Sequence, residues 1–150
     1  MDYLIDTNVL LRSLHRNDPA SRTAREALLT LIQDGRTLCV TLQNAAEFWV
    51  VCTRPKGGPS NGLGLAAHNV ERYFSRFEPF FAIVPETTDV YATWKRLVTT
   101  YNVSGLKAHD TRLVAVMLTH GVESILTFNV SDFRRYSGIT VVHPAEILPL

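Results

Sequence analysis

Four acidic side chains in this sequence stand where carboxylates can do chemistry. Asp6 directly follows a short apolar run, and Asp132 comes shortly after another. Asp110 lies in the first turn of an amphipathic segment, and Glu47 lies among apolar residues. Each has a simple structural explanation by itself: a helix cap, a turn, an interaction with a helix dipole, or an exposed position on a helix. These explanations weaken for the set, because three of the four acids fall at one edge of a predicted parallel sheet.

Carboxylates gathered at one edge of a sheet need a positive partner. Two carboxylates about 4 Å apart repel each other by roughly 4 kcal/mol at an effective dielectric constant of 20. A ligand set made only of oxygen atoms suits Mg²⁺ or Mn²⁺ rather than Zn²⁺. The chemistry that fits is hydrolysis of a phosphodiester, in which the metal activates a water and neutralises the oxygens of the transition state.

The elements that must hold these acids alternate between short apolar runs and segments with a 3.6-residue period. This alternation is typical of a sheet with helices packed on its faces. About five strands separated by helices favour an α/β fold with a mostly parallel sheet. The predicted strands cover residues 3–5, 38–40, 80–84, 124–128 and 139–142. Three predicted helices lie after residue 6, around residue 24 and after residue 87. Three more cover residues 43–53, 66–77 and 108–120, and a short one covers 144–148.

Composition limits the class of protein. The chain has 150 residues, of which 46% are hydrophobic and 19% charged, and this predicts a single domain over residues 1–150. A formal net charge of +1 excludes the global basic field of a protein that coats DNA. Cys39 and Cys52 match no metal or disulfide spacing and indicate buried thiols in a reducing compartment. Without a secretory signal or a membrane-length apolar run, we expect a soluble, cytoplasmic protein with no membrane partner.

A glycine-rich segment, KGGPSNGLG, covers residues 56–64. It lacks the GK[ST] ending of a phosphate-binding loop and follows a predicted helix rather than a strand. We therefore interpret it as a flexible connector near a substrate groove.

Four stretches of the chain together resemble a known family. They are LIDTNVLL at the start, NAAEFW around Glu47, AHDTRLVA around Asp110 and TFNVSDF around Asp132. Each is short, but in this order they resemble the signature stretches of the PIN domain over essentially the whole chain. The resemblance is closest to the VapC-type toxins of toxin–antitoxin systems, and it includes the segment TRPKGGPSNGLGL.

The resemblance implies a three-layer α/β/α sandwich and a ribonuclease that depends on Mg²⁺ or Mn²⁺. It also implies a cognate antitoxin that blocks the site, and a homodimer. Carried over by position, Asp6 and Asp110 are the principal metal ligands, and Glu47 completes the acidic pocket. The catalytic and supporting positions that it implies are Asp6, Glu47, Asp110 and Asp132, with Thr7, Asn8 and Asn129 in support. Because Asn129 stands where many relatives have an acid, either Asn129 or Asp132 fills the fourth position.

Contacts to RNA must come from local basic residues, since the total charge is close to zero. Phosphate contacts of this kind give affinity without sequence information. The candidates lie within a few residues of the acidic stretches: Arg12, Arg54, Lys56, Lys107, Arg112, Arg134 and Arg135.

An acid at the end of the first strand is also found in other classes of protein. A phosphatase of the haloacid dehalogenase type needs a second acid two residues after the first, where this chain has Asn8. A receiver-like phospho-acceptor needs an acidic pair after the first strand, which is also absent. The remaining alternative is a catalytically weak, PIN-like module that binds RNA or a protein partner.

Overall fold

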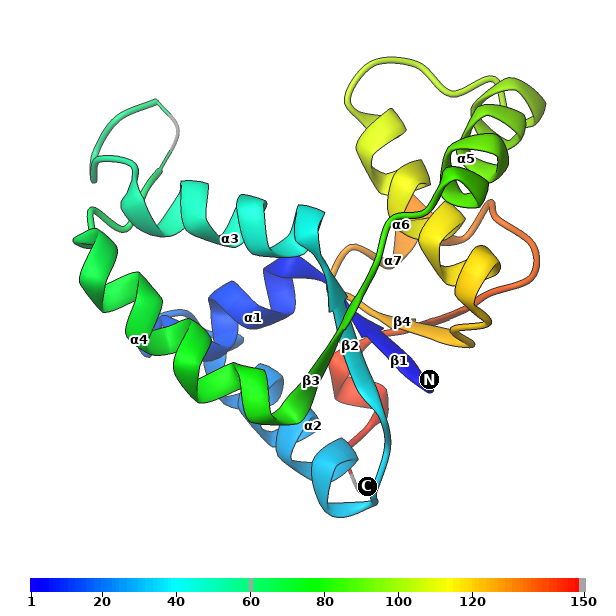
Figure 1. Cartoon of the computed structure of the whole chain (residues 1–150). Helices are drawn as coiled ribbons and strands as arrows, with labels where there is room; N and C mark the ends of the chain where they lie inside the picture. The colour runs from blue at the N-terminus through cyan, green and yellow to red at the C-terminus, as the bar shows by residue number, and fades with distance from the viewer. Residues whose placement is uncertain (60, 149–150) are drawn as a thin grey trace.

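The computed structural model describes residues 1–59 and 61–148, and its sheet has five parallel strands (Figure 1). Ser60 of the predicted connector and residues 149–150 of the predicted domain lie outside the described residues. The strands are β1 (Tyr3–Ile5), β2 (Leu38–Thr41), β3 (Phe81–Val84), β4 (Ser124–Leu126) and β5 (Thr140–Val142). Their order is β3-β2-β1-β4-β5, and every neighbouring pair is parallel. The predicted α/β fold is confirmed.

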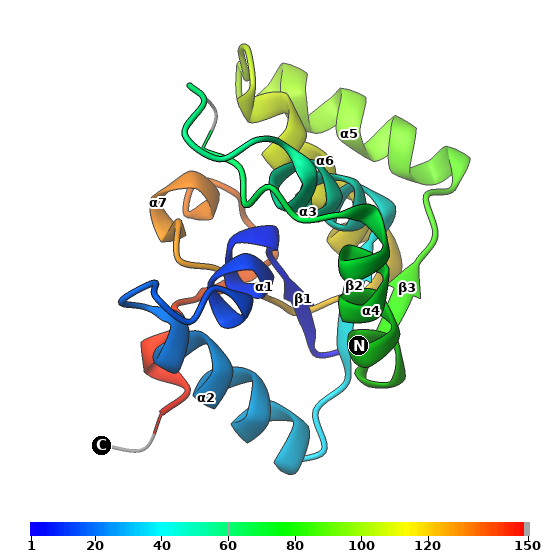
Figure 2. The ribbon, with the colours of Figure 1, turned by 90° about the vertical axis from the view of Figure 1, so that its left-hand side faces the viewer.

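Helices cover both faces of this sheet. The helices are α1 (Thr7–Leu14), α2 (Ser21–Gln33), α3 (Leu42–Thr53), α4 (Ala67–Phe77), α5 (Thr88–Thr100), α6 (Lys107–His120) and α7 (Val130–Phe133). Two 3-10 turns, η1 (Glu78–Phe80) and η2 (Pro144–Glu146), complete the chain. The helices α1 to α4 lie on one side, toward the viewer in Figure 2, and α5 to α7 lie on the other. This is the predicted three-layer sandwich.

Each strand supplies side chains to two apolar cores, because successive residues of a strand point to opposite faces. Leu4 and Cys39 pack with residues of α5 and α6, whereas Ile5 and Leu38 pack with residues of α1 and α2. A parallel sheet covered on both faces needs this continuous apolar pattern. Cys39 and Cys52 are free and buried as predicted, and burial raises the pKa of each thiol to about 11.

Several predicted boundaries differ from the observed ones. The fourth strand ends at Leu126 instead of residue 128, and the hydroxyl of Thr127, the next residue, donates to the carboxylate of Asp6, directly after β1. The short helix α7 was not predicted, since four residues are too few to show a period. The terminal helix predicted over 144–148 is the 3-10 turn Pro144–Glu146. In the described residues, no helix has the length and apolar content needed to cross a membrane.

The second half of the glycine-rich segment is attached to the end of α3. The backbone amide of Leu63 donates to the carbonyl of Val51 (3.0 Å), and that of Leu65 donates to Cys52 (2.8 Å). The amide of Gly64 donates to the carbonyl of Arg54 at 2.9 Å. This part of the segment is therefore a packed turn rather than the predicted flexible connector.

Candidate functional site

Asp6 lies at the carboxyl end of β1, beside the carboxyl end of β4. Ile5 and Leu126 are the last paired residues of these neighbouring strands. The Oδ2 atom of Asp6 accepts hydrogen bonds from Thr127 Oγ1 (2.6 Å) and Asn8 Nδ2 (2.9 Å). The strands β2 and β3 lie on one side of β1, and β4 and β5 lie on the other. The carboxyl end of β1 is therefore the point where the strand order reverses, and open α/β sheets bind ligands at such a switch point. Asp6 stands at the N-cap of α1 but makes no side-chain cap, so the capping interpretation is wrong.

The carboxyl group of Asp6 is buried with only 8% of its surface exposed. Its pKa is raised to about 6, mainly by burial and to a smaller extent by the charges of Glu47 and Asp110, while the hydrogen bond from Thr127 opposes the shift. Asp6, Glu47 and Asp110 therefore come from three distant segments into electrostatic range of one another. The expected gathering of acids at this edge of the sheet is present.

Glu47 is held by hydrogen bonds on both carboxylate oxygens. Thr7 Oγ1 donates to Oε2 at 2.8 Å, and Gln43 Nε2 donates to Oε1 at 2.9 Å. The same amide of Gln43 donates to the backbone carbonyl of His109 at 3.0 Å, which ties α3 to α6. Thr7 also accepts from Asn44 Nδ2 at 3.2 Å. Glu47 is thus oriented toward the sheet edge and is not a freely moving surface residue.

Asp110 and Asp132 share one positive charge. Lys107 Nζ lies 3.6 Å from Asp110 Oδ2 and within hydrogen-bond distance of Asp132 Oδ1. Burial raises the pKa of Asp110, with smaller increases from the charges of Asp132 and Glu47, while Lys107 opposes the shift. The helix α7 brings Asp132 to this place, so the turn interpretation of Asp132 is incomplete.

The two candidates for the fourth predicted position, Asn129 and Asp132, have different surroundings. Asn129 is exposed, and its backbone amide donates to Thr127 Oγ1 at 3.0 Å. Asn8 accepts from the backbone amide of Phe128 at 3.2 Å through Oδ1 while its amide holds Asp6. Of the two candidates, it is Asp132 that shares a lysine with Asp110.

Sequence reasoning missed two residues of this network. Thr127 bonds Asp6 from 121 positions away, so only the pairing of β1 with β4 shows its role. Gln43 stands four residues before Glu47 on the same helix, and this spacing could have been recognised as a side-chain pair. A contact of Lys107 with RNA stays a prediction, and in the structure its ammonium pairs with Asp110 and Asp132.

The donor set fits a hard divalent cation. The acids supply only carboxylate oxygens, which Mg²⁺ and Mn²⁺ prefer. In the described part of the chain, no group of three or more His, Cys, Asp and Glu side chains is already within ligand distance of one point. Asp6 takes part in none of the ion pairs of the described residues, and burial raises its pKa. Asp6 and Asp110 are the residues that would hold the ion, with Glu47 beside them.

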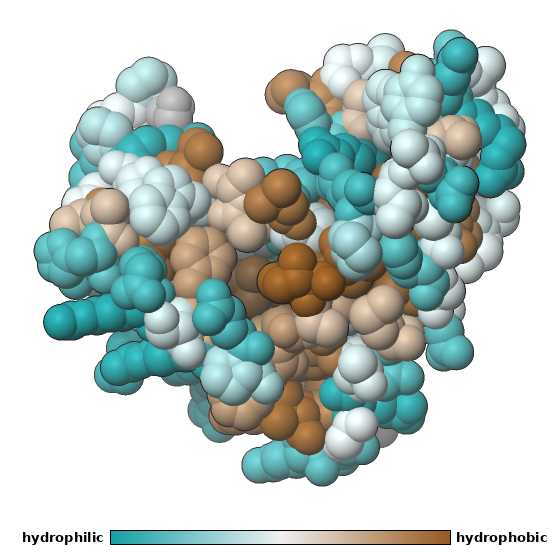
Figure 3. Space-filling view, viewed as in Figure 1, coloured by the Kyte–Doolittle hydropathy of each residue, from teal (hydrophilic) through white to brown (hydrophobic). Residues whose placement is uncertain are grey.

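The seven basic residues predicted to contact RNA differ in what they touch. Those in ion pairs are Lys107 and Arg112, those over aromatic rings are Arg12 and Arg135, and the other three are Arg54, Lys56 and Arg134. The guanidinium of Arg12 lies 4.5 Å from the centre of the Phe128 ring, next to the carboxyl end of β4. Figure 3 shows a hollow between the part of the surface formed by α3 and the part formed by α5 and α6. Through its contact with the Phe128 ring, Arg12 on α1 lies beside the segment that follows β4.

The sequence was compared with known proteins. The PIN domain family model matches residues 3–139. Ribonuclease VapC48 of Mycobacterium tuberculosis is 26% identical over 146 residues, which is 96% of this chain and 98% of that protein.

Solved structures share the fold over nearly the whole chain. VapBC2 from Rickettsia felis, bound to a DNA fragment from its promoter, gives a TM-score of 0.72 at 14% identity, covering 95% of this chain and 98% of that one. A toxin–antitoxin complex from Klebsiella pneumoniae gives 0.64 at 22% identity, covering 95% and 98%. VapC20 of M. tuberculosis, a toxin that cleaves the sarcin–ricin loop, gives 0.64 at 15% identity, covering 89% and 95%.

Proposed function

The chain belongs to the PIN domain family, and on that premise we propose that it is an endoribonuclease that depends on Mg²⁺ or Mn²⁺. We propose further that it is the toxin of a toxin–antitoxin pair. The observation that carries the proposal is the hydrogen-bond network that joins the three acidic segments at the switch point of the sheet. Thr7, next to Asp6, donates to Glu47, and Gln43 donates both to Glu47 and to the carbonyl of His109, next to Asp110. The VapC48 relative, named a ribonuclease, supports the choice of RNA as substrate.

The residues of the site have separate roles in this proposal. Bound at Asp6 and Asp110, the metal supplies the activation of a water and the neutralisation of charge on the phosphate oxygens. Thr127 and Asn8 fix the carboxylate of Asp6, so that its position does not depend on the ion. Thr7 and Gln43 do the same for Glu47. Pre-organised groups of this kind favour the transition state because they need no rearrangement during the reaction.

Lys107 adds an exchangeable positive charge beside the acids of the site. Its ammonium joins Asp110 and Asp132 while being about half exposed, so a phosphate or a metal ion can compete for either partner. We infer that Asp132 takes the fourth acidic position and that Asn129 orients the turn before it. All seven basic residues named above stay candidates for contacts to RNA phosphates, and Arg12, Lys56 and Arg134 are among those that form no ion pair in the described residues.

An antitoxin partner is part of the proposal. Solved relatives include VapBC complexes and a complex described as toxin–antitoxin, several of them bound to DNA. We propose that a small protein encoded beside this chain binds it and blocks the acidic site. The homodimer implied by the family resemblance stays a prediction, as does the single domain over residues 1–150.

A cleavage assay tests the nuclease. The protein, purified without a partner, is incubated with structured RNAs in Mg²⁺, in Mn²⁺ and in EDTA, beside Asp6→Asn, Asp110→Asn and the exposed control Asp34→Asn. We expect cleavage only with metal, and losses of at least about 100-fold in the first two variants, since even removing residues that merely orient metal ligands costs about 10- to 100-fold. The Asp34→Asn variant should match the unmodified chain. Cleavage that persists in EDTA, or in both site variants, contradicts the proposal.

The alternative is a PIN-like module that binds RNA or a partner without cleaving. It is favoured by Asn129, which adds no charge where an acid is common, and by the absence of a ready-made acidic triad in the described residues. This alternative predicts RNA binding that is independent of metal and no cleavage under any condition of the same assay.

A further inference from the structure

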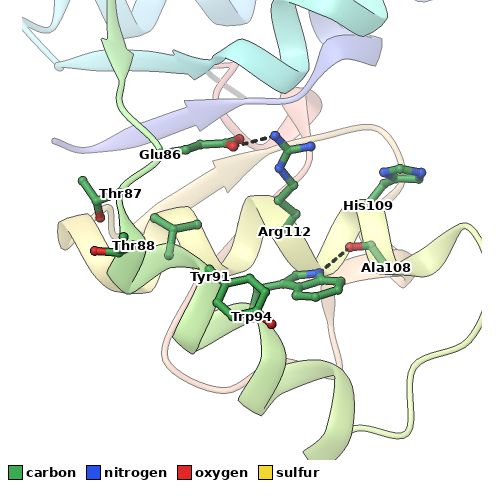
Figure 4. A pocket seen from close by; sticks show the side chains of 9 residues that line it. Glu86, Thr87, Thr88, Tyr91, Trp94, Ala108, His109 and Arg112 are labelled. Carbon is green, nitrogen blue, oxygen red and sulfur yellow. Dashed lines mark hydrogen bonds and ion pairs between the residues drawn. The ribbon is translucent and has the colours of Figure 1, made fainter.

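A cavity of about 600 Å³ lies beside the acidic site, between the segment leading into α5 and the first turns of α6 (Figure 4). Its size is within the range of about 300–1,000 Å³ that is typical of ligand sites. Its lining includes Glu86, Thr88, Tyr91, Trp94, His109 and Arg112. The proposed cleavage chemistry gives this cavity no role.

Two aromatic rings form one wall. The indole N–H of Trp94 donates to the carbonyl of Ala108 at 3.0 Å, which fixes the ring against α6. Tyr91 lies one turn earlier on α5, with ring centres 6.2 Å apart and planes inclined by 33°. Tyr91 is 62% exposed, although burying such a ring is favourable. In Figure 4 the two rings lie side by side along the cavity. They offer a surface on which a flat, apolar ring system can stack.

The polar groups of the cavity suit a neutral ligand. The guanidinium of Arg112 is paired with Glu86, so the two charges cancel across the opening (Figure 4). A free phosphate would meet the carboxylate as well as the guanidinium, and gains little here. The Thr88 hydroxyl and the His109 ring add donors and acceptors near the aromatic wall. A flat ring with hydrogen-bonding edges, which is the chemistry of a nucleobase, matches this combination.

The cavity and the acidic site share the first turns of α6. His109 and Arg112 stand three residues apart on one side of the helix, and Asp110 is the next residue after His109. The carbonyl of His109 accepts from Gln43, whose amide also holds Glu47. The cavity therefore adjoins the acidic site through the start of α6 and through Gln43.

We propose that this cavity binds a base of the RNA next to the phosphodiester at the acidic site, stacked on Tyr91 and Trp94. The assignment rests on the proposed function, since the acids must hold the neighbouring phosphate. Base stacking on aromatic side chains is a general way to bind single-stranded RNA. The other possible occupant of this exposed wall is a second copy of the chain, and the experiment distinguishes the two.

The test uses Trp94 as its own reporter. The sequence has two tryptophans, so Trp49→Phe leaves Trp94 as the only one. The full chain carrying Trp49→Phe and Asp6→Asn is titrated with RNA hexamers of A, C, G or U, and with a hexamer of abasic ribose phosphates. At least one base-bearing hexamer should quench Trp94 emission to saturation, while the abasic hexamer should not. Adding Tyr91→Ala should weaken that binding about tenfold, and Tyr91→Phe should preserve it, because stacking needs the ring only.

Controls separate this proposal from the nuclease proposal. Phe80→Ala removes a ring that is 52% exposed outside this cavity and should leave the titration unchanged. This titration does not measure cleavage, which is measured separately on the chain with Asp6 intact. If that chain cuts no RNA while the titration shows base-dependent quenching, the nuclease proposal fails and the cavity assignment stands. Equal quenching by the abasic hexamer, no quenching by any hexamer, or unchanged binding in Tyr91→Ala overturns the assignment. Sedimentation completes the test: a dimer that Tyr91→Ala dissociates, together with no response to RNA, makes this face an interface between copies.

Discussion

The fold buries the side chain of Asp6, whereas the proposed chemistry needs that side chain ionised. The fold buries its carboxyl group between two strand ends, where burial and the charges of Glu47 and Asp110 raise its pKa from 3.8 to about 6. Below about pH 3.8 the group is protonated in both the folded and the unfolded chain. Between about pH 3.8 and pH 6 the unfolded chain loses this proton while the folded chain keeps it. The free energy of unfolding therefore falls as the pH rises through this range. The difference between the two pKa values corresponds to about 3 kcal/mol.

The first prediction at this scale concerns Asp6→Asn in EDTA. The amide keeps the shape of the side chain, and its oxygen can still accept from Thr127 and Asn8. We expect the variant to be more stable than the unmodified chain at pH 7.5 by up to about 3 kcal/mol, and the gain to disappear toward pH 4. Urea unfolding across this pH range measures it, with the exposed Asp34→Asn as control. A variant that is equally stable or less stable at pH 7.5 contradicts the burial argument.

At the scale of elements, the turn after α3 depends on one close approach of two backbone segments. A Cβ atom at Gly62 would lie 1.9 Å from the carbonyl oxygen of Arg54, whereas at Gly58 the nearest atom, the Pro55 oxygen, is 3.9 Å away. The amide of Gly62 also donates to the Pro55 carbonyl at 3.2 Å. Any side chain at Gly62 therefore pushes this turn away from α3.

We predict that Gly62→Ala lowers the free energy of unfolding by about 1–3 kcal/mol, the usual cost of inserting atoms into packed structure. Gly58→Ala is the matched control, since a Cβ atom there makes only an ordinary van der Waals contact in the same segment, and it should alter stability by less than about 1 kcal/mol. Urea unfolding of the three chains gives the comparison. Equal losses in both variants would show that the close contact at Gly62 is not what holds the turn.

The strands and long helices could be predicted from the sequence, but several contacts of the site could not. Strands and long helices were predicted because apolar periodicity follows directly from burial on two faces, and the acid after β1 followed from the geometry of parallel strands. The partners of that acid could not be predicted the same way. Thr127 reaches Asp6 only because β4 pairs with β1, and Lys107 reaches Asp132 only because α7 turns back. Such contacts depend on strand order and on short helices, which local patterns do not encode.

At the scale of the whole molecule, the layer formed by α1 to α4 has an outer face of its own. A groove of about 420 Å³ runs between α2 and the end of α4. Its apolar lining includes two side chains that are more than half exposed, Leu29 at 56% and Phe80 at 52%. Three arginines, Arg16, Arg25 and Arg76, also line it. An apolar segment flanked by acidic residues complements this groove in both shape and charge.

We predict that this groove holds such a segment of the antitoxin, and that Phe80→Asp weakens the complex at least tenfold. A carboxylate there must be buried against apolar side chains when the partner binds, which costs more than the 1.4 kcal/mol that a tenfold change represents. Val50 on α3 is equally exposed, at 52%, and lies outside the groove lining, so Val50→Asp is the matched control. Co-expression with the neighbouring small reading frame, followed by calorimetry of the complex, measures both. Equal weakening by the two variants would mean that a new surface charge, and not the groove, disturbs the partner; weakening by Val50→Asp alone would place the antitoxin on α3.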